Sequence, residues 1–201
     1  VVFDLPVTVS LMALGTGASF PFRWDAEHEP RVGLVPRNGD GSDVIWCPIK
    51  PNYTYHPMNA YEDDAGNVVI DVCRYEKMFD QDTLGPFGDS LPRLDRWTIN
   101  PTTRKVSEEI IDARTQEFPR CHPGLNGKPY QYGYTVAVDG YSFPSIYKHD
   151  LKAGTSTEHK VGAGRQSAEP VFIPREGATA EDDGYLMTYV FDGNKNTSDL
   201  V

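Results

Sequence analysis

The side chains best suited to metal binding or proton transfer near neutral pH are the five histidines of the chain. No two of them have the His-x-His or His-Glu-x-x-His spacing that would place two ligands on one element. His28 lies in a charged loop, and His149 and His159 lie in polar stretches, so we expect all three to be exposed. His122 follows Cys121, but adjacent residues of an extended chain point to opposite faces and do not easily share a proton.

His56 has a different setting, because it lies in an aromatic-rich stretch where a strand is expected to open into a loop. A single histidine in such a place is more often a core or rim residue than a metal ligand. Glu117 and Glu169 each lie in a mainly apolar run beside a proline. A buried carboxylate needs a partner, and the free N–H of a metal-bound imidazole is a suitable one. Ion pairs with Arg120 or Arg175 are the alternative that the sequence leaves open.

The elements that position these residues are expected to be strands. Short β-branched and aromatic runs follow Asp/Gly turns, as at 67–72 after 64–66 and at 185–190 after 182–184. Residues 103–114 fit a helix or a strand equally well. The 18 glycines and 16 prolines indicate many turns. The sequence therefore predicts an all-β chain.

A weak repeat indicates which kind of all-β fold this is. In 96–100, 146–150 and 188–192, an aromatic residue is followed three positions later by Asn or Asp and then by a turn. The copies lie about 40–50 residues apart, which is the length of a four-stranded propeller blade. Any β meander can produce such turns by chance. On this period the chain holds about four blades, and we expect it to be a piece of a longer protein.

Composition restricts the function classes. The chain has 29 acidic and 19 basic residues and no Lys/Arg block, which argues against nucleic-acid binding. Three scattered cysteines, Cys47, Cys73 and Cys121, are typical of reduced thiols, so we expect a cytoplasmic protein. The apolar stretch 1–14 is interrupted by an acidic residue and a proline, so neither a signal peptide nor a membrane helix is expected.

The stretch around His56 resembles the histidine-bearing motif of the carotenoid cleavage oxygenases, a family that includes lignostilbene dioxygenases and the retinoid isomerohydrolase of the eye. It reads Tyr-His-Pro-Met-Asn-Ala-Tyr-Glu-Asp over 55–63. Further matching motifs follow in the order of the family, at 31–37, 117–120, 128–134, 169–175 and 181–184. The resemblance covers nearly the whole chain. It implies a partial domain over 1–201, formed by the middle-to-late blades of a seven-bladed β-propeller.

The resemblance also implies a metal site. Members of this family hold one non-haem Fe(II) with four histidines, three of which are hydrogen-bonded by outer glutamates. His56 matches the third ligand in chain order, and Glu117 and Glu169 match two of the glutamates. The first, second and fourth ligands have no counterpart here. By this resemblance, the chain carries one of four ligands and is expected to hold no catalytic iron by itself.

The implied reaction is the addition of O₂ across a conjugated C=C bond of a carotenoid or apocarotenoid, which yields two carbonyl products. An aromatic tunnel would hold this apolar substrate. Tyr55 stands where the family often has Phe and is a candidate for its lining, although ordinary packing is the alternative. A stilbene-cleaving dioxygenase and a non-catalytic propeller remnant that acts as a binding module are the other hypotheses. Peripheral membrane contact is a further expectation, which no amphipathic helix supports.

Overall fold

The computed structural model describes residues 1–17 and 20–201, and most of the regular structure in them is antiparallel β-sheet. The predicted all-β class is therefore confirmed. Helical structure is restricted to α1 (Leu11–Gly15) and two 3₁₀ turns in the described part, Gly41–Asp43 and Pro123–Leu125. The Ser10 side chain accepts a hydrogen bond from the amide of Ala13 and caps α1. No helix among the described residues is long and apolar enough to span a bilayer.

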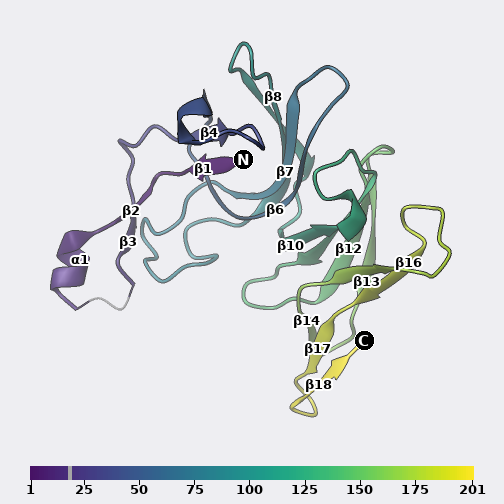
Figure 1. Ribbon diagram of the computed structural model, residues 1–201. Coiled ribbons are helices and arrows are strands. Elements are labelled where there is room, and N and C mark those ends of the chain that lie inside the picture. The colour runs from purple at the N-terminus through teal and green to yellow at the C-terminus, as the bar shows by residue number, and fades with distance from the viewer. Residues whose placement is uncertain (18–19) are drawn as a thin grey trace.

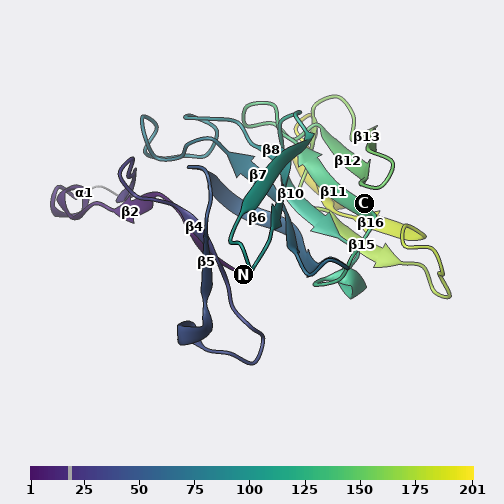
Figure 2. The same ribbon diagram turned by 90° about the horizontal axis from the view of Figure 1, so that it is seen from above.

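The N-terminal quarter of the chain forms a small sheet and a separate hairpin. The sheet has the order β1-β4-β5, and β2 pairs with β3. The hairpin and α1 extend away from the remaining sheets in both views (Figures 1 and 2). The bounds are β1 (Val2–Asp4), β2 (Val7–Val9), β3 (Phe22–Trp24), β4 (Arg31–Leu34) and β5 (Ile45–Pro48).

Two four-stranded meanders form the middle of the chain, with the orders β6-β7-β8-β9 and β10-β11-β12-β13. In each sheet every strand pairs with its neighbour in sequence. Most connections are short, whereas longer loops join β7 to β8 (76–92) and β10 to β11 (122–131). The first strand of the second sheet, β10, lies against β6, β7 and β8 of the first (Figure 2). The bounds are β6 (Tyr53–Glu62), β7 (Val68–Tyr75), β8 (Arg93–Ile99), β9 (Val106–Asp112), β10 (Gln116–Cys121), β11 (Tyr132–Ala137), β12 (Ser145–Asp150) and β13 (Thr155–Lys160).

The C-terminal part is also an antiparallel meander, but its strands are interrupted. Strand β15 pairs with β16, whereas β14 pairs with β17, and β17 also pairs with β18. Thr188 alone separates β16 from β17, so the two pairings form one long hairpin that is broken near its middle. The bounds are β14 (Arg165–Ser167), β15 (Val171–Pro174), β16 (Gly184–Met187), β17 (Tyr189–Asp192) and β18 (Thr197–Leu200).

In the sheet β6–β9, strand β7 is buried on both faces. Ile70 and Val72 of β7 belong to a core shared with β4 and β5, whereas Cys73 belongs to a second core with Met58 and Cys121. This alternation follows from the two-residue period of a strand. The stacking of one sheet between two others fixes β6, which carries His56.

Two sequence-based interpretations can now be resolved. Residues 103–114, which fitted a helix or a strand, form a turn followed by β9. In the proposed repeat, 96–100 and 146–150 end the third strands of their sheets, β8 and β12. The copy at 188–192 falls in β17, the middle strand of β14-β17-β18, so it is not equivalent to the other two. The repeat was therefore wrong in its third copy, because aromatic-x-x-Asp turns occur at the ends of different strands.

Candidate functional site

His56 lies where the pairing of β6 with β7 is interrupted. The register shifts between Thr54 and Pro57 and again between Pro57 and Asn59, so β6 contains extra residues opposite β7. Such bulges re-aim a side chain, and they tolerate Pro57, which has no N–H for a ladder bond. The His56 side chain is consequently 44% exposed although its strand lies between two cores.

Glu117 lies at the corresponding kind of interruption in β10. The register against β11 shifts between Glu117 and Arg120, and Phe118 has a left-handed φ of 54°. A bulky residue in this region is an outlier that costs about 1–3 kcal/mol, and it persists because its surroundings require it. The bulge buries the Glu117 side chain, which is only 3% exposed.

The two interruptions bring His56 and Glu117 together across 61 residues of sequence. The imidazole Nδ1 lies 2.7 Å from Oε2 of Glu117, and the Phe118 amide donates to the same oxygen at 2.6 Å. Because an ionised carboxylate is acceptor-only, Nδ1 carries the proton and donates. The hydrogen bond to Glu117 raises the pKa of His56, against the opposing effect of desolvation. In the neutral ring, Nε2 keeps a lone pair.

The second oxygen of Glu117, Oε1, is buried and has no hydrogen-bond partner within the described structure. The fully buried Tyr75 lies close to this carboxylate, and burial together with Glu117 raises the pKa of Tyr75 well above its usual range. Its hydroxyl therefore stays protonated beside the carboxylate. The Glu117 carboxylate is thus surrounded by hydrogen-bond donors, the imidazole of His56 and the amide of Phe118.

Two residues that the sequence analysis did not select hold β6 in place beside β10 and β11. The Asn59 side chain accepts from the Gly127 amide and donates to two carbonyls of the loop 125–128. Met58 packs on Gly133, where a Cβ would lie 2.2 Å from the Met58 sulfur. A larger residue at 133 would have to displace the Met58 side chain from this position, so the glycine permits the close approach.

Glu169 lies between β14 and β15 and forms its ion pair with Arg120 rather than with His56, although its charge also acts to raise the pKa of His56. Its Oε1 is 2.7 Å from Nε of Arg120, and the two side chains are 36% and 52% exposed. This is one of the two ion pairs that the sequence left open. Arg175 pairs instead with Asp183.

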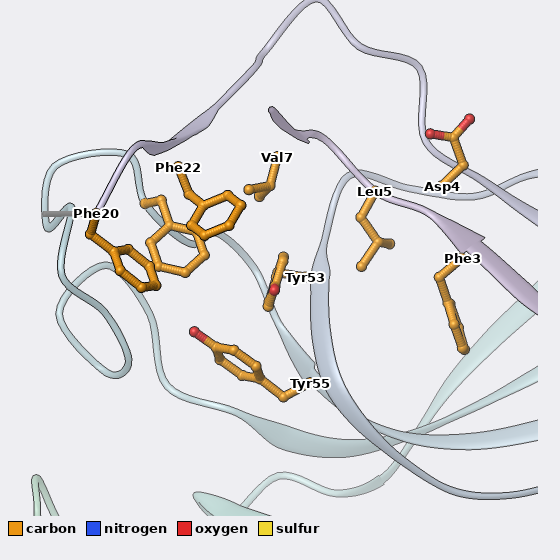
Figure 3. Close-up of a pocket in the computed structure, with 9 residues that line it drawn as sticks. Phe3, Asp4, Leu5, Val7, Phe20, Phe22, Tyr53 and Tyr55 are labelled. Atoms are coloured by element: carbon orange, nitrogen blue, oxygen red, sulfur yellow. The ribbon is translucent and has the colours of Figure 1, made fainter. Parts of the chain in front are cut away.

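Tyr55, which precedes His56 in sequence, lines an aromatic cavity of about 390 Å³ (Figure 3). Phe20 and Phe22 lie across the cavity from Tyr53 and Tyr55. The Tyr55 ring centroid is 6.1 Å from that of His56. The other lining residues are Phe3, Asp4, Leu5, Val7 and Phe79. The wall of the cavity is mainly aromatic and aliphatic, and Tyr55 is the lining residue next to His56 in sequence.

The other histidines lie elsewhere. The expectation that His149 is exposed was wrong: it is fully buried in β12, with Asp112 at the end of β9 beside it. His159 is exposed, as expected. His28 is partly exposed and pairs with Asp4 at 2.8 Å. His122 accepts from the Gly124 amide in a 3₁₀ turn. No cluster of three or more His, Cys, Asp or Glu side chains able to hold a metal occurs within residues 1–17 and 20–201.

This geometry can be compared with known proteins. The family model of the retinal pigment epithelial membrane protein (RPE65) matches residues 1–201. The chain belongs to this family. It is 42% identical over 199 residues to the carotenoid cleavage oxygenase of Mycobacterium tuberculosis. It is 31% identical over 195 residues to the apocarotenoid-15,15'-oxygenase of Synechocystis. The resemblance seen in the sequence motifs is thereby confirmed.

The fold of the chain also matches solved structures. The cobalt-substituted Synechocystis ACO superimposes with a TM-score of 0.87 at 29% identity, covering 99% of this chain and 44% of that one. The two curated relatives are matched over 93% and 92% of this chain but over only 40% and 39% of their own lengths. The chain therefore spans about two-fifths of each curated relative.

Proposed function

We propose that this RPE65-family chain forms part of an Fe(II)-dependent dioxygenase that cleaves a conjugated C=C bond of a carotenoid or apocarotenoid. The observation that carries the proposal is the His56–Glu117 pair. The carboxylate occupies Nδ1 and leaves Nε2 as a metal ligand, which is the usual arrangement of an imidazole in a protein metal site. The names of the curated relatives support the reaction class.

The donor chemistry of His56 fits iron, because imidazole is a suitable ligand for it. We assign the remaining three imidazoles to residues outside this chain, in a seven-bladed propeller of which these sheets form about four blades. Iron, when bound, supplies the centre at which O₂ is activated. Glu117 orients the His56 ring and increases the basicity of Nε2.

Glu169 is proposed to support a histidine that is not part of this sequence. Arg120 occupies Oε1 of Glu169, and the proposal assigns the other oxygen to that histidine. The ion pair fixes the position of the Glu169 carboxylate beside β10. Glu117 and Glu169 would then each orient a different ligand.

The aromatic cavity is proposed to hold part of the conjugated substrate. Its aromatic and aliphatic walls bury apolar surface, and Tyr55 brings the cavity next to His56. In the overall reaction the C=C bond breaks and each of its carbons receives one atom of O₂, which yields two carbonyl products. Holding the conjugated substrate in the cavity would select which of its double bonds lies beside the metal.

The test is the variant His56→Ala in the full-length protein that contains this chain. We expect loss of stoichiometric iron, measured by elemental analysis, and loss of cleavage of an apocarotenoid under ¹⁸O₂. The matched control is His159→Ala, because His159 is exposed on β13. Full iron content and cleavage in His56→Ala would refute the ligand assignment.

A further inference from the structure

We propose that Asn59 is a positioning residue, which holds β6 and the loop 122–131 at the separation that the His56–Glu117 hydrogen bond requires. Its side-chain amide forms four hydrogen bonds, three of them with this loop. The inference rests on the proposed function, because the pair that Asn59 would position is the one assigned to the metal.

The first argument is that every hydrogen-bonding group of the Asn59 side chain is used. Oδ1 accepts from the amides of Gly127 and Ala60, both at 2.9 Å. Nδ2 donates to the carbonyls of Leu125 and Lys128, at 3.0 and 3.1 Å. The reverse orientation would place donors against donors and acceptors against acceptors, so the orientation of the amide is fixed. Asn59 is only 8% exposed, so water does not readily replace these partners.

The second argument is the place of these bonds in the chain. Asn59 lies shortly after His56, where regular pairing of β6 with β7 resumes beyond the bulge. The loop 122–131 begins directly after β10, which carries Glu117. The His56–Glu117 hydrogen bond and the Asn59 bonds therefore connect the same two segments at two points. A single connection leaves the segments free to rotate about it, whereas a second connection removes that freedom.

The third argument is that the loop itself has a fixed position. The hydroxyl of Tyr130 donates to Asp71, a fully buried residue of β7. The amide of Tyr132, directly after the loop, donates to Oε1 of Glu181 at 2.7 Å. Asn59 is thus joined to a loop that two other parts of the molecule also hold. The position of His56 depends on such support, because its side chain is 44% exposed and packing covers only part of it.

The substitution Asn59→Asp tests the amide with little change of shape. The aspartate keeps one oxygen for the amides of Gly127 and Ala60. Its second oxygen faces the two loop carbonyls that Nδ2 satisfies in the unsubstituted protein. An ionised carboxylate has no proton to donate, so repulsion between these oxygens would move the loop away from β6.

Two controls separate local positioning from general destabilisation. Asn100→Asp is the matched variant, because Asn100 also accepts from two amides, in the turn after β8, and donates to Asn67. The ring N–H of His149 is the internal control, because this fully buried histidine lies in β12, in a different sheet from β6. Asn59→Ser removes the amide without adding a charge, and it keeps the test valid if Asn59→Asp does not fold.

The first measurement uses the metal-free full-length protein with ¹⁵N-labelled histidine. NMR follows the exchange with water of the His56 Nδ1 proton, which is assigned by its absence from His56→Ala. This exchange should accelerate about tenfold or more in Asn59→Asp and less than about twofold in Asn100→Asp. The His149 proton should keep its rate in all variants. Unchanged exchange at His56, or equal acceleration at His149, would overturn the inference.

The second measurement is the affinity of the same variants for cobalt(II), the metal in the cobalt-substituted Synechocystis ACO. Competition with a chelator should show a loss of about tenfold for Asn59→Asp and little change for Asn100→Asp. Faster exchange at His56 with unchanged cobalt affinity would also overturn the inference. If the unsubstituted protein binds no cobalt, or if His56→Ala binds it equally well, the proposed function fails. The exchange measurement then still decides whether Asn59 positions the His56–Glu117 pair.

Discussion

Two histidine–carboxylate pairs in this chain differ in almost every physical respect. His56 lies in a bulge of β6, is 44% exposed, and is 2.7 Å from Glu117. His149 is fully buried in β12, and its Nδ1 is 3.7 Å from Asp112, beyond hydrogen-bond distance. Its Nε2 instead lies 3.0 Å from the hydroxyl of Thr135. His56 therefore has an unpaired ring nitrogen, Nε2, on a partly exposed side chain, whereas the whole ring of His149 is buried.

The difference shows which effect decides the charge of a histidine. A direct hydrogen bond to Glu117 outweighs desolvation and raises the pKa of His56. For His149 desolvation dominates, Asp112 compensates only partly, and the pKa falls to about 4. The two pairs therefore affect folding stability with opposite signs. Pairing of His56 stabilises the fold at acid pH and this contribution is lost as the pH rises through its raised pKa, whereas His149 destabilises the fold as the pH falls below 6.5.

The largest expected effect concerns His149. Between pH 6.5 and 4, His149 is protonated in the unfolded chain but mostly neutral in the folded chain. The free energy of unfolding should therefore fall by about 3 kcal/mol through this residue. His149→Gln keeps a donor for Thr135 and removes the titration. Urea unfolding at pH 7 and pH 4 should show a smaller acid loss for the variant than for the unsubstituted chain. Equal losses would contradict the buried neutral state.

The next effect concerns the other pair. Glu117→Gln removes the charge that orients and polarises His56, and we expect a loss of about 10–100-fold in iron affinity of the full-length protein. Asp112→Asn is the matched control, because Asp112 faces His149 rather than His56. Competition with a chelator measures both affinities. A comparable loss in the two variants would show that the effect is general destabilisation.

The smallest effect concerns the third carboxylate, Glu169. Because its ion pair with Arg120 is partly exposed, Arg120→Gln should change the free energy of unfolding by less than about 1 kcal/mol. Chemical unfolding at neutral pH checks this. A loss above about 2 kcal/mol would place Glu169 with the buried pairs instead of the exposed ones.

The sequence could mark His56 and Glu117 separately, through an aromatic stretch and a carboxylate in an apolar run. Their pairing came with the family resemblance, because no local pattern joins residues 61 positions apart. Glu169 has the same local pattern as Glu117 but is one-third exposed. A carboxylate within an apolar run is a property of the local sequence, whereas its burial depends on which other sheet covers the strand.

Other features could not be predicted for identifiable reasons. His149 lies among polar neighbours, but β12 is an inner strand of its sheet and is covered, so polarity was a poor guide to exposure. A left-handed Phe118 has no sequence signal, since glycine and asparagine are the residues expected there. The sequence of 103–114 was equally compatible with a helix and a strand. Its residues 106–112 form a strand because they pair with β8.

The long separation of His56 and Glu117 also bears on the order of folding. Hairpins between neighbouring strands form within microseconds. Even the longest loop within a meander, 76–92, is much shorter than the separation of His56 from Glu117, so each meander can form by comparatively local steps. The pair joins the first strand of one meander to the first strand of the next, and closing that long loop costs additional chain entropy. We therefore expect the site to be assembled among the last contacts, after a stage in which both meanders exist and His56 still lacks its carboxylate.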